Sequence, residues 1–191
     1  MIAWEVTRSC NLACVHCRAS AEHGPYPREL STEECIRIMD EIAFFSKPVI
    51  ILTGGGDKAF VAGADITAFI GLTRVTAEQF ALSIQSILLK MEGSKKVVIC
   101  AINGLALGGG CELALYCDMV IATERAKFGQ PEIQVGVFPP IAALIFPRMM
   151  GRKKALELIL SGETIGAQEA LTLGLINKVV PEASLPQEVN G

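Results

Sequence analysis

Three cysteines near the start of the chain have the spacing of a metal-cluster motif. Cys10, Cys14 and Cys17 form a C-x3-C-x2-C pattern that follows a strand-like run. Cysteine thiolates are the usual ligands of iron–sulfur clusters, and three of them would leave one iron of a cubane open to a small molecule. Two other interpretations stay open. One is a zinc site with His16 or His23 as the fourth ligand, and the other is a group of thiols that binds no metal.

Glycine-rich runs and two glutamates form a second set of residues that could do chemistry. The runs read AGAD at 62–65 and NGLALGGGCE at 103–112, and FGQPE follows at 128–132. Small residues allow the backbone to come close to a ligand. Carboxylates such as those of Glu112 and Glu132 can act as general acids or bases. A buried glutamate can also be a paired structural charge, and a GGG run can simply form a tight turn.

The apolar pattern predicts an α/β chain that would hold these residues. STEE at 31–34 is a capping box and predicts a helix that runs to about Phe45. A continuous apolar strand is expected at 49–53, so the chain opens with a βαβ unit. Further along, the pattern predicts strands at 97–102, 119–122 and 175–180 and helices at 76–91, 111–117, 151–160 and 167–173.

Composition limits the classes of function. The chain has 191 residues, of which 51% are hydrophobic, enough for one buried domain or one domain with a partial second. The formal net charge is −3 and there is no long basic run, so nucleic acid is not an expected partner. The apolar stretch 97–122 contains Asn103, Glu112 and Asp118, which a lipid-spanning helix would carry only at high cost. No membrane span is therefore expected.

The start of the chain and its cysteines indicate the compartment. Glu5 and Arg8 interrupt the first ten residues, so we expect no secretory signal segment. Seven cysteines in such a chain fit free or metal-bound thiols in a reducing compartment better than disulfides. The predicted location is the cytoplasm.

From 49 to 181 the chain resembles the crotonase (enoyl-CoA hydratase/isomerase) superfamily. The matching segments are VIILTGGGDKAFVAGADI at 49–66, AINGLALGGGCELALYCDMVIA at 101–122, FGQPEIQVGVFP at 128–139 and RKKALELILSGETIGAQEALTLGLINKVV at 152–180. The resemblance implies a crotonase-like ββα spiral core. It also implies a lyase of fatty-acid metabolism that acts on an acyl-CoA thioester and requires no cofactor.

This resemblance also implies roles for four residues. The backbone N–H groups of Ala64 and Gly109 would form an oxyanion hole for the thioester carbonyl, whose oxygen becomes enolate-like during the reaction. Glu112 and Glu132 would hold and activate the water that adds to the α,β-double bond, with one as base and the other supplying or relaying the proton.

The resemblance extends to the coenzyme and to assembly. Lys58, Ala62 and Asp65 are expected near the CoA part of the substrate. A solvated surface lysine is an equally simple interpretation of Lys58. Relatives form trimers through C-terminal helices that also cover the acyl pocket, whereas only ten residues follow Pro181 here. A trimer is thus implied by the family but is not expected of a chain without those helices.

Residues 1–55 resemble the start of a different family, the radical S-adenosylmethionine enzymes. The Cys10, Cys14 and Cys17 spacing, with His16 before the last cysteine, carries this resemblance. It implies a [4Fe-4S] cluster, with S-adenosylmethionine at the open iron, on a βαβ segment like the start of that family's partial barrel. The chain then divides into 1–48, radical-enzyme-like, and 49–191, crotonase-like. The alternatives to a hydratase are a cluster-binding fragment of a radical enzyme and a non-functional fusion of the two.

Overall fold

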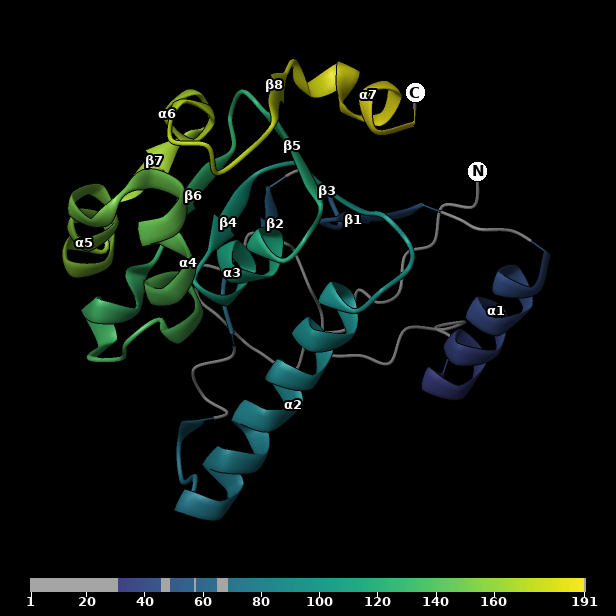
Figure 1. The fold of residues 1–191 in the computed structure, drawn as a ribbon, viewed down its shortest axis with the longest axis horizontal. Coiled ribbons are helices and arrows are strands. Elements are labelled where there is room, and N and C mark those ends of the chain that lie inside the picture. The colour runs from purple at the N-terminus through teal and green to yellow at the C-terminus, as the bar shows by residue number, and fades with distance from the viewer. Residues whose placement is uncertain (1–30, 46–48, 57, 65–68, 191) are drawn as a thin grey trace.

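The first described element is a helix that the sequence predicts. The computed structural model describes residues 31–45, 49–56, 58–64 and 69–190. Helix α1 spans Thr32–Phe45. Its capping box is formed, since the Ser31 N–H donates to Glu34 Oε2 at 2.8 Å and the Glu34 N–H donates to Ser31 Oγ at 3.2 Å. The helix stands apart from the two sheets of the fold (Figure 1).

The first sheet is parallel throughout. It contains β1 (Ile50–Thr53), β3 (Val98–Ile102), β5 (Met119–Thr123) and β8 (Lys178–Val180), in the order β1-β3-β5-β8. Its inner strands are almost continuously apolar and buried, as expected for a parallel sheet covered on both faces.

The second sheet is built from strands of three residues each. It contains β2 (Ala59–Val61), β4 (Leu105–Leu107), β6 (Lys127–Gly129) and β7 (Thr164–Gly166), in the order β2-β4-β6-β7. The first three strands run parallel, and β7 runs antiparallel to β6.

The chain crosses from the first sheet to the second three times, from β1 to β2, from β3 to β4 and from β5 to β6. Because β1-β3-β5 and β2-β4-β6 have the same order, the three crossings lie next to one another. We call the crossing residues 54–56 and 58, 103–104 and 124–126 the corner of the fold. The N-terminal ends of β2, β4 and β6 lie at this corner, and their C-terminal ends point away from it.

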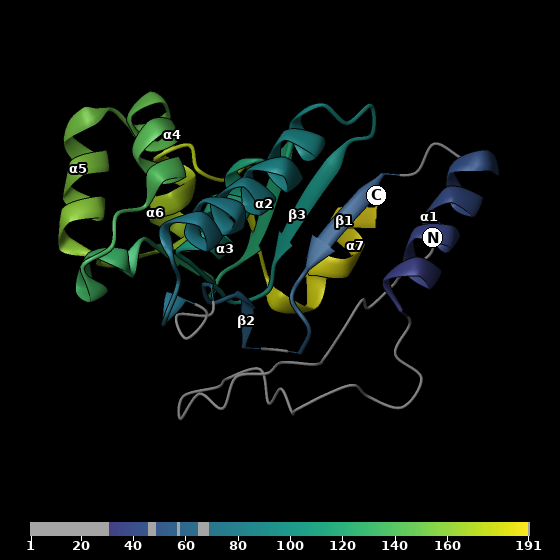
Figure 2. The same cartoon turned by 90° about the horizontal axis from the view of Figure 1, so that it is seen from below.

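Helices connect and cover the sheets (Figures 1 and 2). They are α2 (Arg74–Glu92), α3 (Gly109–Leu115), α4 (Pro140–Met150), α5 (Arg152–Ser161), α6 (Ala167–Thr172) and α7 (Leu185–Asn190), with 3-10 turns η2 (Pro131–Val135) and η3 (Glu182–Ser184). The main core includes Ile102, Phe128 and Phe146, so it joins both sheets to α4. Within the described ranges, no helix combines the length and apolarity needed to cross a lipid bilayer.

The last strand of the first sheet is shorter than the sequence pattern indicates. Of the predicted strand at 175–180, only Lys178–Val180 pairs with the sheet. Gly174 adopts a φ of +77°, and Asn177 exchanges hydrogen bonds with the Val120 backbone. The chain changes direction here before β8 begins. Leu175 and Ile176 therefore pack into the core and do not pair as strand residues.

Candidate active site

The candidate catalytic residues follow the C-terminal ends of three neighbouring strands. Residues 62–64 follow β2, Gly108 and Gly109 follow β4, and the segment 130–132 follows β6. Because β2, β4 and β6 are adjacent and parallel, these three segments meet at one edge of the second sheet. The structure thereby brings together groups that are up to 70 positions apart in the sequence.

The two predicted oxyanion-hole residues lie next to each other. A Cβ placed on Gly109 would lie 4.0 Å from the backbone nitrogen of Ala64. Gly109 is the first residue of α3, so its N–H is one of the N–H groups that a helix leaves without an internal acceptor. Among the described residues, neither of these two N–H groups donates to another backbone group. As far as the described residues go, both can therefore donate to an external oxygen atom.

Glycines allow the close packing on which this site depends. A Cβ on Gly110 would overlap the carbonyl oxygen of Val61 in β2, so only glycine lets α3 approach that strand. Gly108 adopts a φ of +54°, and a Cβ there would lie 2.5 Å from Oε1 of Glu132. The GGG run therefore serves packing at two of its positions and leaves Gly109 facing the Ala64 segment.

Glu112 is buried and is held by the start of another helix. Its side chain is 8% exposed, and Oε1 accepts hydrogen bonds from the N–H groups of Ile141 and Ala142, both at 3.0 Å. These are the free N–H groups of the first turn of α4, which favour a negative charge. Burial raises the pKa of the carboxyl, and the two hydrogen bonds oppose that rise only in part.

Glu132 is half-buried on η2 and feels the charge of Glu112. Burial raises its pKa, and the negative charge of Glu112 raises it further. Gln130 is fully buried, and its side-chain amide faces this carboxylate. With its amide nitrogen directed at Glu132, Gln130 donates to Oε2 at 3.1 Å and to Oε1 at 3.3 Å. Sequence reasoning missed Gln130, although its position two residues before Glu132 at the end of β6 was a usable signal.

Cys111 stands beside these two glutamates and is not a reactive thiol. It is buried, and burial together with the charges of Glu112 and Glu132 raises the pKa of the thiol to about 12. A thiol that stays protonated is a poor nucleophile. We therefore expect Cys111 to contribute packing rather than nucleophilic chemistry.

The residues predicted to lie near CoA occupy different places. Ala62 directly follows β2 and is exposed beside Ala64, whereas the exposed Lys58 precedes β2 at the corner. The three-residue strand between them spans about 10 Å. Asp65 lies outside the described residues.

The predicted cluster ligands Cys10, Cys14 and Cys17 also lie outside the described residues, so the cluster and the S-adenosylmethionine site stay predictions. In the part of the chain that the structure describes, no three histidine, cysteine or acidic side chains gather as metal ligands would.

Residues 30–190 match the sequence model of a family described as Enoyl-CoA hydratase/isomerase. A crotonyl-CoA hydratase from Syntrophomonas wolfei is 46% identical over 141 residues, which are 73% of this chain and 54% of that relative. A short-chain-enoyl-CoA hydratase from Clostridium acetobutylicum is 42% identical over 137 residues, covering 71% of this chain and 52% of the relative. The chain thus spans about half the length of these curated relatives.

Solved structures agree with the sequence comparison. The enoyl-CoA hydratase of Bacillus anthracis superposes with a TM-score of 0.71 at 36% identity, over 84% of this chain and 64% of that one. The two sheets and the three crossings described above are therefore a crotonase-like α/β fold. Because the family model matches residues 30–190, which are most of this chain, the chain belongs to the enoyl-CoA hydratase/isomerase family.

Proposed function

We propose that this chain is a hydratase that adds water across the α,β-double bond of an enoyl-CoA thioester. The observation that carries the proposal is the convergence of two adjacent backbone N–H groups and two buried or half-buried carboxylates at one sheet edge. The same four residues, Ala64, Gly109, Glu112 and Glu132, are those that the resemblance assigns to hydration. The named activities of the relatives support the same reaction.

In this mechanism the N–H groups of Ala64 and Gly109 bind the thioester carbonyl oxygen. Negative charge grows on that oxygen when the water oxygen attacks C3 of the enoyl group. Preorganised donors stabilise such a charge most strongly in a site from which water is excluded. Gly109 contributes further because the N-terminal end of α3 favours negative charge.

The two carboxylates divide the proton transfers between them. Glu112 accepts two backbone N–H groups that favour its anionic form, so it is suited to take a proton from the attacking water. The charge of Glu112 favours the protonated form of Glu132, which is then suited to deliver a proton to C2. The water thereby supplies the hydroxyl group at C3 and, overall, the hydrogen at C2. Ala62, Asp65 and Lys58 are proposed to lie along the CoA part of the substrate.

The test is hydration of crotonyl-CoA by the purified chain, beside Glu112→Gln and Glu132→Gln. Each variant keeps the size of the side chain but removes a proton acceptor or donor, so each should lose activity by about 100-fold or more. Equal rates in the parent and both variants would contradict the proposal. Absence of hydration by folded parent protein that still binds the thioester would contradict it as well.

A further inference from the structure

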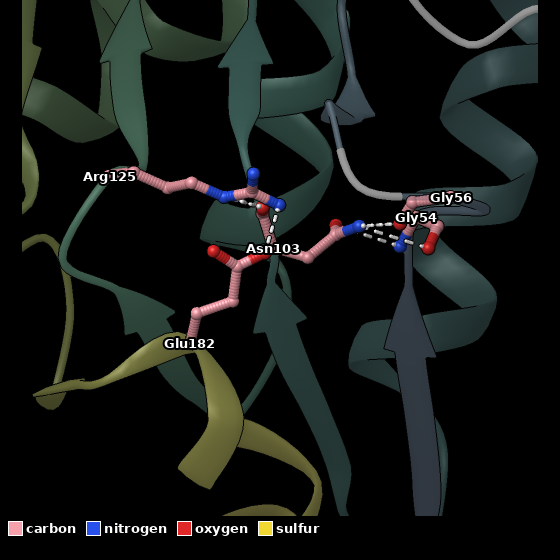
Figure 3. Close-up of polar contacts among 5 residues, drawn as sticks. All are labelled: Gly54, Gly56, Asn103, Arg125 and Glu182. Atoms are coloured by element: carbon pink, nitrogen blue, oxygen red, sulfur yellow. Dashed lines mark hydrogen bonds and ion pairs between the residues drawn. The ribbon is translucent and has the colours of Figure 1, made fainter.

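The buried side chain of Asn103 joins two crossings of the corner. Its Oδ1 accepts the Gly54 N–H at 3.2 Å, and its Nδ2 donates to the carbonyl oxygens of Gly54 at 3.1 Å and of Gly56 at 2.8 Å. Figure 3 shows the amide directed at this loop from the end of β3. Asn103 is 8% exposed, so three of its hydrogen bonds are made where water cannot easily replace them.

The third crossing is attached to the backbone of the same residue. Arg125 Nε donates to the Asn103 carbonyl oxygen at 3.1 Å, and Arg125 Nη2 pairs with Glu182 Oε1 at 2.6 Å (Figure 3). The Lys127 N–H also donates to the carbonyl oxygen of Gly104, at 3.3 Å. Asn103 is thus the point at which the three crossings from the first sheet to the second are tied together.

This link matters because the β2–β4 pairing is short and irregular. Ala59 pairs with Leu105 and Val61 with Ala106, with a register shift between the two pairs. A strand of three residues with such a shift has few ladder bonds to fix where it lies along its neighbour. The position of β2 therefore depends on what holds the loop that leads into it, and Asn103 holds that loop.

The corner and the candidate site lie at opposite ends of the same short strands, β2 and β4. Gly54 and Gly56 lead into β2, which ends two residues before Gly63 and three before Ala64. Asn103 leads into β4, which ends next to Gly108 and Gly109. A displacement of β2 against β4 at the corner would therefore displace the Ala64 N–H against the Gly109 N–H, which lie beyond the other ends of these strands, each about 10 Å long.

We propose that Asn103 is a positioning residue for the oxyanion hole, which it sets by fixing the Gly54–Gly56 loop and hence the placement of β2 beside β4. The inference rests on the proposed function of the site, because it concerns two N–H groups that bind a thioester carbonyl. Asn103 touches neither the substrate nor the reacting atoms. Its effect is expected on carbonyl polarisation and turnover rather than on binding of the CoA part.

Asn103→Asp is the most selective variant. It preserves the size and the acceptor for the Gly54 N–H, but it directs a second oxygen at the carbonyl oxygens of Gly54 and Gly56. Asn177→Ala is the matched control, since Asn177 also binds backbone across the first sheet, through the Val120 N–H at 2.7 Å. Asn177 lies in the turn before β8 and not at the corner.

The primary measurement is the infrared carbonyl stretch of bound [1-13C]butyryl-CoA, a saturated thioester that cannot be hydrated. Hydrogen bonds to the carbonyl lower this frequency, so the parent should show a downshift from the free thioester. Asn103→Asp should lose most of the downshift with little change in the Kd, and Asn177→Ala should keep it even if the protein melts earlier. With crotonyl-CoA, Asn103→Asp should lower kcat by up to about 100-fold, as misplacement by about 1 Å can do, with a small change in KM.

Two results would overturn the inference. One is a carbonyl downshift in Asn103→Asp as large as that in the parent. The other is a parent that binds butyryl-CoA without any downshift, because the chain would then have no oxyanion hole for Asn103 to position. A parent that shows the downshift but does not hydrate crotonyl-CoA would contradict the proposed reaction alone, and the infrared comparison would still decide the role of Asn103.

If Asn103→Asp does not fold, Arg125→Lys is the second variant. It changes the more exposed partner, whose Nε donates to the Asn103 carbonyl oxygen. It should weaken the downshift in part, and an unchanged frequency would count against the inference.

Discussion

The carboxylate of Glu132 lies directly against the backbone of Gly108. A Cβ on Gly108 would be 2.5 Å from Oε1 and 3.3 Å from Cδ of Glu132, so a side chain at this position would force the Glu132 carboxylate to move. Gly108 also has a φ of +54°, a conformation that residues with a Cβ rarely adopt. The absence of a side chain at this turn is therefore what allows the second carboxylate to reach the site.

Gly108→Ala is expected to remove most of the hydratase activity. The methyl group would displace Glu132, and the positive φ would lower the free energy of unfolding by about 1–2 kcal/mol. Gly151→Ala is the matched control, because Gly151 also has a positive φ outside the left-handed helical region (φ +79°, ψ 157°) but open space around its Cβ position. Steady-state kinetics and chemical denaturation of both variants provide the check. Equal losses of activity in the two variants would show that backbone strain, and not the position of Glu132, is responsible.

Gly109→Pro is expected to lower kcat by about 100-fold to 1,000-fold, because proline removes one of the two proposed oxyanion donors. The first residue of a helix tolerates proline well, so α3 should still form. Gly109→Ala keeps the N–H, and its Cβ would fit at 4.0 Å from the Ala64 nitrogen, so this variant should stay active. Similar activities in Gly109→Pro and Gly109→Ala would rule out the Gly109 N–H as a donor.

Glu112→Gln is expected to make the fold more stable above about pH 5, while it abolishes hydration. Burial raises the pKa of Glu112 above its ordinary value of 4.5, so the folded chain holds the proton more tightly than the unfolded chain does. The stabilisation that comes from this proton is complete at low pH and is lost as the pH rises through the raised pKa. Glutamine carries no charge and avoids this loss.

The measurement for Glu112→Gln is the free energy of unfolding of both proteins by denaturant, from about pH 4 to pH 8. The advantage of the variant over the parent should be smallest at the acidic end and should grow as the pH rises. An advantage that shrinks with rising pH would mean that the hydrogen bonds from Ile141 and Ala142 outweigh the burial of the carboxylate.

The sequence predicted those parts of the fold that have long local patterns. STEE at 31–34 predicted α1, and its reciprocal hydrogen bonds are present. The helix expected at 76–91 is α2, which begins two residues earlier because Thr73 and Thr76 form a capping box. Strands β2, β4, β6 and β7 could not all be predicted, since three residues are too few for a periodicity. The same limit applies to the order of the two sheets, which depends on contacts between distant segments.

The sequence predicted which residues gather at this sheet edge, but it did not predict the backbone groups that hold Glu112 there. Ala64, Gly109, Glu112 and Glu132 stand in recognisable motifs, and the structure places them at one sheet edge. The N–H groups of Ile141 and Ala142 that hold Glu112 have no sequence signature, because any residue but proline supplies an N–H. Asn103 was visible only as part of a glycine-rich run, although its amide ties the corner together.

The N-terminal part of the chain is where the resemblance to radical S-adenosylmethionine enzymes adjoins the resemblance to the crotonase superfamily. The sequence placed the boundary between them after residue 48, whereas the family match begins at residue 30 and so includes α1. The resemblance of the first residues to radical S-adenosylmethionine enzymes, and the cluster that it implies at Cys10, Cys14 and Cys17, stays a prediction. Iron content and visible absorbance after anaerobic purification would test it.

Hydratase activity is tested most directly by following the oxygen of water into the product. Crotonyl-CoA would be incubated with the parent chain and with Glu132→Gln in H2 18O, and the product analysed by mass spectrometry. We predict that the parent forms 3-hydroxybutyryl-CoA with one 18O atom at C3, and that Glu132→Gln forms it at least about 100-fold more slowly. Labelled product at equal rates from both proteins, or no labelled product from folded parent protein, would contradict the proposed function.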